Sequence, residues 1–445
     1  MNNKNTNNHL MIDGCDSVEL VKQYGTPLYV ISQKKIEEKC QEIRKDFLSK
    51  YNNTRALYAS KAFLTMAMCK IIEKEGLGLD VVSGGELYTA LKAKFPTDEI
   101  VFHGNNKSYK ELYMAISNNV GRIVVDNLYE LDIIQKIAKK LDKKINILYR
   151  ITPGVNSNTH KYIITGQKDS KFGIPLERDI IFYAVKKAIS SKYVDLKGFH
   201  FHVGSQLSEN KSHIQAIDIA TKLMKELKDK LGFVTKELNT GGGYGIPHLE
   251  DDMRRSLKYF IKPIMNRIQK KISQYNLSMP EVMIEPGRWI IGEAGTTLYT
   301  IGSIKDIPGI RTYVAIDGGM TDNPRPSLYG AEYYGVIANK LNKEKLNTVT
   351  IAGKCCESGD VLIKDIKLPD VEHGDILAVY NTGAYNFSMA SNYNRNPRPA
   401  VVLVKEGNVD VIVKRQTYDD LLNGEEIPKN LNNKEDNSSK VKGII

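Results

Sequence analysis

The stretch Arg55-Ala56-Leu57-Tyr58-Ala59-Ser60-Lys61-Ala62 decides the fold of this chain. Its small and apolar residues predict a buried β-strand over 55–59, and a helical pattern follows over 64–75. Lys61 lies at the junction, where a lysine most often reaches into solvent. The local pattern alone favours that interpretation over a functional amine, so the role of Lys61 depends on the rest of the chain.

Strand and helix patterns alternate outward from this stretch. The segments predicted as strands are 55–59, 78–82, 99–103, 122–126, 145–151, 196–203, 235–240 and 281–285. The segments with helical periodicity are 64–75, 86–94, 109–118, 128–141, 177–190, 214–231 and 253–275. Eight such alternations over roughly 230 residues predict an α/β fold with a (β/α)8 TIM-like barrel, and an open doubly wound sheet is the alternative.

Polar residues at the C-terminal ends of these strands favour the barrel, because barrel enzymes build their sites on that rim. These residues are Lys61, Asp80, Ser83, His103, Asp126, Arg150, His202, Gly241, Gly242, Gly243 and Glu285.

The pattern of residue types changes after residue 288. Segments rich in valine, isoleucine, threonine and tyrosine, with glycine between them, predict an all-β domain over 289–425. Residues 33–288 form the predicted barrel, and residues 11–32 are expected to pack with the β-domain and could supply it with a strand. The segments 1–10 and 426–445 are polar and are expected to be a disordered tail and a polar tail.

Composition excludes several classes of protein. The 445 residues, 41% hydrophobic and 26% charged, contain neither an apolar run of about 18 residues nor a signal-peptide pattern, so a cytoplasmic protein without membrane contact is expected. The five cysteines lack CxxC spacing, which argues against a disulfide framework and a metal site. The net charge of +11 suggests nucleic-acid binding as a possible function. The lysines, however, alternate with acidic residues on helical faces, so no nucleic-acid partner is expected.

Eleven blocks of sequence resemble one family, the diaminopimelate decarboxylases. They are YASKA around Lys61, HGNNK at 103–107, HKYIITG at 160–166, DSKFGI at 169–174, GFHFHVGSQ at 198–206, NTGGGYGI at 239–246, EPGR at 285–288, DGGMTDNPRPSLYG at 317–330, GKCCESGD at 353–360, GAYNFSMASNYNRNPRP at 383–399 and RQTYDDLL at 415–422. The resemblance covers about residues 10 to 425. It implies a pyridoxal-phosphate enzyme built from an α/β barrel followed by a β-domain. This two-domain architecture agrees with the one that the strand and helix patterns predict.

The resemblance implies that Lys61 binds pyridoxal 5′-phosphate covalently. A lysine suits this role, since partial burial lowers its pKa. Decarboxylation of an amino acid needs an electron sink, which this cofactor provides and side chains do not. Glu285 matches the carboxylate that faces the ring nitrogen, whereas an ion pair at the barrel end is the alternative for the residue taken alone. The resemblance makes Cys356 the second catalytic residue, as proton donor to the substrate carbon.

Further cofactor contacts follow from the resemblance. Gly241, Gly242 and Gly243, followed by Gly245, could offer amides to the phosphate after the seventh strand, where barrels commonly bind phosphates, although most glycine-rich turns are only turns. His202 is expected to stack on the ring, and His200, which faces the same side of its strand, is interpreted as a core histidine. The remaining expected cofactor contacts are Asp80, Ser205, Gly287, Arg288 and Tyr385.

Charge suggests the substrate. Arg325 lies between two prolines, a stiff mount for binding a carboxylate. Arg288, Tyr329 and Tyr385 can add contacts, and Glu357 can pair with an ammonium group. A pocket with both signs fits meso-2,6-diaminopimelate, whose decarboxylation gives L-lysine and carbon dioxide, the last step of lysine biosynthesis. Whether Arg288 serves the substrate carboxylate or the cofactor phosphate is left open.

Two alternatives share the fold: a decarboxylase of ornithine, lysine or arginine, and an amino-acid racemase. A racemase is expected to have an arginine in place of Glu285 and to lack the CESGD block. The resemblance also implies a homodimer in which Cys356 and Glu357 complete the site of the partner subunit.

Overall fold

The structure, a computed structural model, describes residues 8–155 and 169–431. Its first part is a closed barrel of eight parallel strands in chain order, with β11 pairing back to β4. The strands are β4 (Thr54–Ala59), β5 (Gly78–Val81), β6 (Ile100–Phe102), β7 (Arg122–Val125), β8 (Ile145–Arg150), β9 (Val194–His200), β10 (Glu237–Asn239) and β11 (Glu281–Ile284). The barrel prediction is confirmed.

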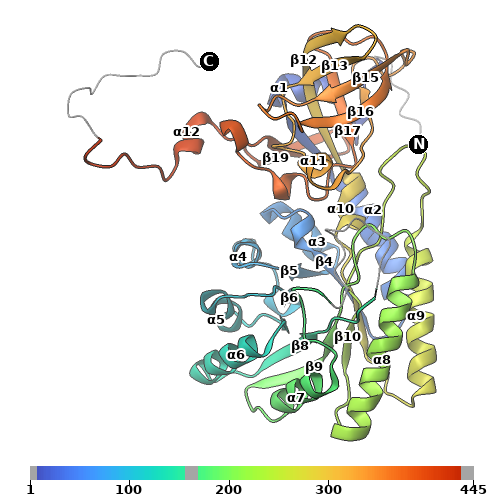
Figure 1. The fold of residues 1–445 in the computed structure, drawn as a ribbon, viewed down its shortest axis with the longest axis vertical. Coiled ribbons are helices and arrows are strands. Elements are labelled where there is room, and N and C mark those ends of the chain that lie inside the picture. Colours follow the sequence, from blue (N-terminus) through green and yellow to red (C-terminus); the bar gives the residue numbers. More distant parts are fainter. Residues whose placement is uncertain (1–7, 156–168, 432–445) are drawn as a thin grey trace.

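Helices surround this barrel (Figure 1). They are α2 (Gln33–Ile43), α3 (Met66–Lys74), α4 (Gly84–Lys92), α5 (Tyr109–Ser117), α6 (Leu128–Leu141), α7 (Arg178–Ile189), α8 (Lys211–Leu231), α9 (Leu257–Gln274) and the short α10 (Arg288–Ile291). Small polar N-caps determine several starts: the helix expected from residue 253 begins at Leu257, because the Ser256 side chain accepts from the Tyr259 amide. Within the described ranges, no helix combines the length and apolarity needed to cross a lipid bilayer.

The two ends of the barrel differ in chemistry. A small buried cluster from five strands fills the interior: Leu57, Val101, Val124, Leu148 and Met283. At the N-terminal ends of the strands, Arg55 and Arg122 pair with surrounding glutamates, and Arg122 binds Glu237 through two contacts of 2.7 Å. This end is closed by ion pairs, so a ligand can enter only from the C-terminal ends of the strands.

The second domain is a nine-stranded sheet with the order β16-β15-β13-β12-β3-β18-β19, in which β17 pairs with β12 and β14. Its strands are β3 (Leu28–Ser32), β12 (Gly295–Ile307), β13 (Arg311–Ile316), β14 (Gly335–Ile337), β15 (Asn347–Ala352), β16 (Val361–Leu368), β17 (Ile376–Tyr380), β18 (Ala400–Lys405) and β19 (Asn408–Val413). All five residues of β3 are buried. The N-terminal strand therefore belongs to the β-domain, between β12 and β18.

The other N-terminal residues also contact this domain. The hairpin β1 (Met11–Ile12) and β2 (Cys15–Asp16) precedes α1 (Ser17–Tyr24), a helix that the sequence patterns did not predict. Leu10, which lies in the segment expected to be a tail, is buried, and its amide donates to Ala338 O at 2.7 Å. Figure 1 shows the β-domain above one end of the barrel, beside α3 and α10.

Candidate active site

A cavity of about 490 Å³ opens where the C-terminal ends of the barrel strands meet the β-domain. It is lined by most of the residues that the sequence predicted: Lys61, Asp80, His202, Ser205, Gly242, Gly243, Glu285, Gly287, Arg288, Arg325, Tyr329 and Tyr385. His103, Arg150 and His200 also line it. Residues far apart in the sequence and from both domains thus share one cavity.

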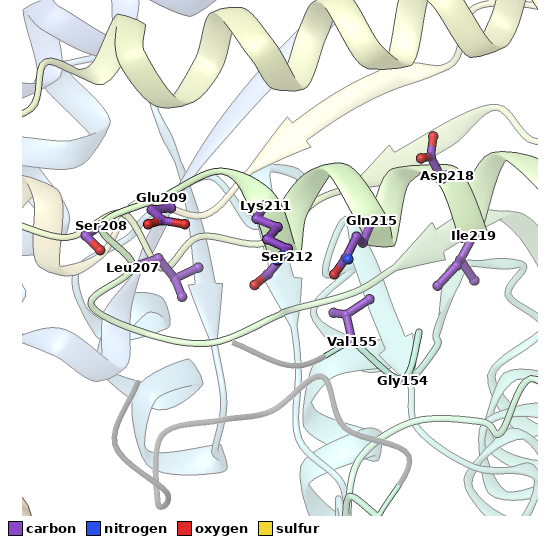
Figure 2. Close-up of a pocket in the computed structure, with 10 residues that line it drawn as sticks. All are labelled: Gly154, Val155, Leu207, Ser208, Glu209, Lys211, Ser212, Gln215, Asp218 and Ile219. Atoms are coloured by element: carbon purple, nitrogen blue, oxygen red, sulfur yellow. The ribbon is translucent and has the colours of Figure 1, made fainter. Parts of the chain in front are cut away.

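A larger cavity of about 630 Å³ lies beside the start of α8 (Figure 2). None of its lining residues is a predicted site residue, and Asp218, an acidic residue there, already binds Arg267 through two hydrogen bonds. The residues that the sequence predicted for the site therefore line the first cavity and not this one.

Lys61 lies in the one-turn helix Ser60–Ala62 directly after β4. Burial acts to lower the pKa of Lys61, but Tyr385, Asp80 and Glu285 outweigh burial and raise it above its ordinary value. The expectation that the pKa of Lys61 is lowered is therefore wrong, because it considered burial and left out the acidic groups that face the amine. The lysine is held charged among these groups.

Glu285 follows β11 and is held by three side chains. Asn239 Nδ2 donates to its Oε1 at 2.7 Å, His103 Nε2 lies 2.8 Å from Oε1, and His200 Nε2 lies 3.3 Å from Oε2. Burial alone would raise the pKa of Glu285, but His103 and His200 lower it well below its usual range. The carboxylate is therefore ionised.

His200 is buried with a hydrogen-bond partner, Glu285, as expected of a satisfied core histidine, and it also lines the cavity. Burial lowers its pKa to about 3, so its ring is neutral at physiological pH. Burial raises the pKa of the neighbouring Asp80 to about 6, against the lowering effect of His103. His103, His200 and Glu285 also have ligand atoms within 4.8 Å of one another. Among the described side chains, they are the one group that could bind a metal ion.

The glycine loop is packed too tightly for any side chain. A Cβ on Gly242 would lie 2.0 Å from Glu285 O, and one on Gly243 would lie 2.1 Å from Gly204 O. Gly241 and Gly243 also have positive φ angles, 70° and 95°. His213 supports the loop from α8, with Nε2 3.0 Å from Gly242 O. Gly242 and Gly243 line the cavity, whereas the Gly241 amide donates to Asn239 Oδ1 at 3.0 Å.

Two buried arginines lack a carboxylate partner. Arg288 and Arg325 are 6% and 5% exposed, and within the described chain neither forms an ion pair and both Nε atoms lack a hydrogen-bond partner. Arg288 Nη2 donates to Ser205 Oγ at 3.2 Å, and burial and the charge of Arg325 lower the pKa of Arg288 to about 10. Buried cations without anions are costly, so this end of the cavity is built for an anionic ligand.

The loop around Tyr385 joins the β-domain to the turn that carries Lys61. The Tyr385 amide donates to Ala62 O at 2.8 Å, and Ser388 Oγ donates to the same oxygen at 3.0 Å. Tyr385 has a φ of 67°, and its ring lies against the guanidinium groups of Arg288 and Arg325 at 4.8 and 5.6 Å. The Tyr385 ring is thus shared by both arginines.

Cys356 and Glu357 do not reach this cavity in their own chain. Both are exposed, on a turn whose Cys356 amide donates to Asn394 Oδ1 at 2.7 Å. Asp360 organises the turn by accepting from the amides of Cys355 and Met320 at 2.9 and 2.7 Å. The structure therefore separates these two predicted site residues from Lys61.

Sequence reasoning missed the roles of some residues. His103 and Arg150 were noticed only as polar residues at strand ends. Asn239 lies two residues before Gly241 in the NTGGGYGI block, and this position was a signal that was not used. His213 had no signal, because it lies within an ordinary amphipathic helix pattern. The block at 160–166 lies outside the described residues.

Comparison with known proteins gives a consistent result. Residues 33–292 match the family model of the pyridoxal-binding domain of pyridoxal-dependent decarboxylases. The chain is 48% identical to a diaminopimelate decarboxylase of Bacillus subtilis over 94% of this chain and 95% of the relative, and 50% identical to that of Bacillus methanolicus over 93% and 95%. A crystal structure of diaminopimelate decarboxylase from M. jannaschii with L-lysine superimposes with a TM-score of 0.90 at 37% identity, covering 96% and 98% of the two chains.

Proposed function

Because this chain belongs to the diaminopimelate decarboxylases, a family of pyridoxal-dependent enzymes, we propose that its cavity converts meso-2,6-diaminopimelate to L-lysine and carbon dioxide, the last step of lysine biosynthesis. The observation that carries the assignment is the pair of buried arginines without carboxylate partners, in one cavity with Lys61 and the ionised Glu285. Such a cavity needs an anionic ligand at one end and an amine-reactive ligand at the other.

The residues present fit pyridoxal phosphate. Lys61 is positioned to bind its carbonyl carbon, the ionised Glu285 to hold a proton on the ring nitrogen, and His202 to cover the ring. The amides of Gly242 and Gly243, together with Ser205 and Arg288, suit the phosphate. When bound, the cofactor supplies an electron sink for the electrons released with carbon dioxide. His103 contacts Glu285 at 2.8 Å and lies 3.7 Å from Asp80.

Arg325 is the specificity residue of this proposal. Arg288 is engaged with Ser205, so it fits the phosphate, and Arg325 is then the arginine that can bind a distal carboxylate of the substrate. Tyr329 and Tyr385 flank that guanidinium at 5.4 and 5.6 Å from ring centre to Cζ. Of the candidate substrates, only diaminopimelate has a carboxylate at the far end.

We further propose a two-fold homodimer with two composite sites. Cys356 and Glu357 are exposed and lie outside the cavity of their own chain, which supports a role in the partner's cavity. There, Cys356 would protonate the substrate carbon and Glu357 would pair with the distal ammonium group.

The direct test is an assay of the purified protein with pyridoxal phosphate. We expect a visible absorbance band from the bound cofactor, absent in Lys61→Ala, and faster turnover of meso-diaminopimelate than of lysine or ornithine. Arg325→Ala should lose far more activity than cofactor affinity, because a carboxylate left unpaired in a buried pocket is costly. Arg267→Ala, which removes an arginine–carboxylate pair outside the cavity, is the matched control. A colourless protein, or faster turnover of lysine, would refute the proposal.

A further inference from the structure

One peptide unit of the glycine loop is held by a side chain from outside the barrel strands. Gly242 O accepts a hydrogen bond from His213 Nε2 at 3.0 Å. His213 lies in the first turn of α8 and is fully buried. Figure 1 shows α8 on the outside of the barrel, and His213 is not among the residues that line the cavity. The histidine therefore contacts the loop from the side that faces away from the cavity.

The neighbouring peptide units of the loop are held by main-chain donors. The Gly241 carbonyl accepts from the Glu285 amide at 2.9 Å, and the Gly243 carbonyl accepts from the Leu207 amide at 2.9 Å. Among the described contacts of these three consecutive carbonyls, Gly242 O is thus the one that a side chain holds. The orientation of its peptide unit depends on one residue.

The peptide unit between Gly242 and Gly243 needs such a contact because both of its flanking residues are glycines. Their close approach to Glu285 O and Gly204 O leaves no room for a Cβ at either position. Glycine, however, occupies positive and negative φ about equally readily, so a peptide unit between two glycines can turn over at little cost. The packing that requires glycine here therefore leaves the direction of this peptide unit open, and a contact with its carbonyl restricts it.

The direction of this peptide unit decides what the cavity presents to an anion. The peptide bond is trans, so its carbonyl and its N–H point in opposite directions. With Gly242 O turned toward α8, the Gly243 N–H points toward the cavity, which Gly243 lines. In the reverse orientation a carbonyl oxygen would face the cavity and repel a phosphate, whereas the observed orientation offers a donor.

The His213 ring is a neutral donor in a fixed position. Burial lowers its pKa to about 4, against the raising effect of the hydrogen bond with Gly242. Because a carbonyl oxygen can only accept, the ring proton lies on Nε2. The ring also stacks on Tyr244, with centroids 5.7 Å apart and planes at 20°. The contact with Gly242 O therefore persists at neutral pH and adds no charge behind the loop.

We propose that His213 is a positioning residue for the cofactor phosphate: by holding Gly242 O, it aims the Gly243 amide at the phosphate oxygens. It acts through the loop and does not touch the cofactor. Its effect on affinity is therefore confined to ligands that carry a phosphate. This inference rests on the phosphate site proposed above, to which Ser205 and Arg288 also belong.

Comparing pyridoxal phosphate with pyridoxal, which lacks the phosphate, tests this inference in the full-length protein. Absorbance titration gives the dissociation constant of each ligand. His213→Phe keeps a ring against Tyr244 and removes the donor. It should raise the dissociation constant of pyridoxal phosphate roughly tenfold, since one buried hydrogen bond is lost, and leave that of pyridoxal unchanged. His213→Gln, which restores an N–H donor, should recover part of the lost affinity, and His213→Leu is a second variant without a donor.

Thr221→Val is the matched control on the same helix. Thr221 is fully buried, and its hydroxyl donates to Ile217 O at 2.7 Å within α8, so its loss should change neither dissociation constant. Equal weakening of both ligands in the donor-free His213 variants, or wild-type affinity for both, would overturn the role of His213 and leave the function intact. A wild-type protein that binds pyridoxal as tightly as pyridoxal phosphate would instead overturn the phosphate site itself.

Discussion

At the scale of single residues, Asn239 links the two ends of the cofactor site. Its Nδ2 donates to Glu285 and its Oδ1 accepts from the Gly241 amide, so one buried side chain orients both the carboxylate and the glycine loop. We expect Asn239→Leu to weaken pyridoxal-phosphate binding by roughly tenfold, since two buried hydrogen bonds are lost. Titration of the absorbance band with cofactor measures this.

The control is Asn239→Asp, which keeps the acceptor for Gly241 and replaces the amide that faces Glu285 with a carboxyl group. It should keep more cofactor affinity than Asn239→Leu, yet show a shifted pH dependence of the absorbance band, because two adjacent carboxyl groups do not both ionise readily. Wild-type affinity in Asn239→Leu would show that the loop is held by other contacts.

Asp322 makes stability depend on pH. Burial raises its pKa to about 7, against the lowering effect of its hydrogen bond with Tyr299. A carboxyl whose folded pKa exceeds its unfolded pKa stabilises the fold most at low pH and loses this contribution as pH rises through 7. We expect Asp322→Asn to flatten the fall in unfolding free energy between pH 4 and pH 7 by roughly 2 to 4 kcal/mol. Urea unfolding at several pH values tests this, and an equally steep fall in the variant would contradict it.

Residue types at strand ends made much of the cavity predictable. Lys61 and Glu285 are polar residues at the ends of predicted strands, which placed them on the barrel rim, and the resemblance then indicated their roles. Arg325 is marked by its flanking prolines. The contact between His200 and Glu285 was not predictable, because it depends on how two strands separated by one other strand face each other across the barrel interior. The pKa of Lys61 was misjudged for the same reason: its acidic neighbours come from other strands and from the β-domain.

At the scale of elements, the glycine loop limits what the chain tolerates. A methyl group on Gly242 would overlap the carbonyl oxygen of Glu285, which is backbone and cannot turn aside. We expect Gly242→Ala to reduce the unfolding free energy by roughly 3 kcal/mol and to weaken cofactor binding. Urea unfolding and cofactor titration measure the two effects.

Gly85 provides the matched control. It lies in the first turn of α4, where an added methyl group would meet only Ser83 Oγ at 3.8 Å. Gly85→Ala should be neutral or stabilising by up to about 1 kcal/mol. If Gly242→Ala were equally harmless, the packing argument for the loop would be wrong.

The repeating elements could be predicted and the irregular ones could not. Most of the eight strands carry apolar runs, and the hairpin of β18 and β19 has glycine in its turn, as expected. Strand ends shifted: the strand predicted over 235–240, which contains one apolar residue, Leu238, is observed as β10 over Glu237–Asn239. The 385–388 loop depends on contacts with the distant Ala62, to which a local pattern is blind. The helix α1 had local signals that were not used, namely the N-cap Asp16 and the following Gly25.

At the scale of the whole molecule, the composite site that we propose predicts complementation. Lys61→Ala and Cys356→Ala should each be nearly inactive. Co-refolded in equal amounts, about half of the dimers should be mixed, and each should contain one site built from two undamaged halves, restoring roughly a quarter of wild-type activity. Differently tagged chains verify that mixed dimers form. Mixed dimers without activity would mean that each chain completes its own site.

The position of β3 in the β-domain has a consequence for synthesis. This strand leaves the ribosome early, yet both of its neighbours, β12 and β18, are made after the entire barrel. Until β12 and β18 have been synthesised, both edges of the apolar strand β3 stay unpaired, and such exposed edges favour aggregation. Lys61 is likewise made long before Arg325 and Tyr385, so a nascent chain has a finished barrel and an unfinished catalytic cavity. The cell therefore obtains a working enzyme only when nearly the last strand has been translated.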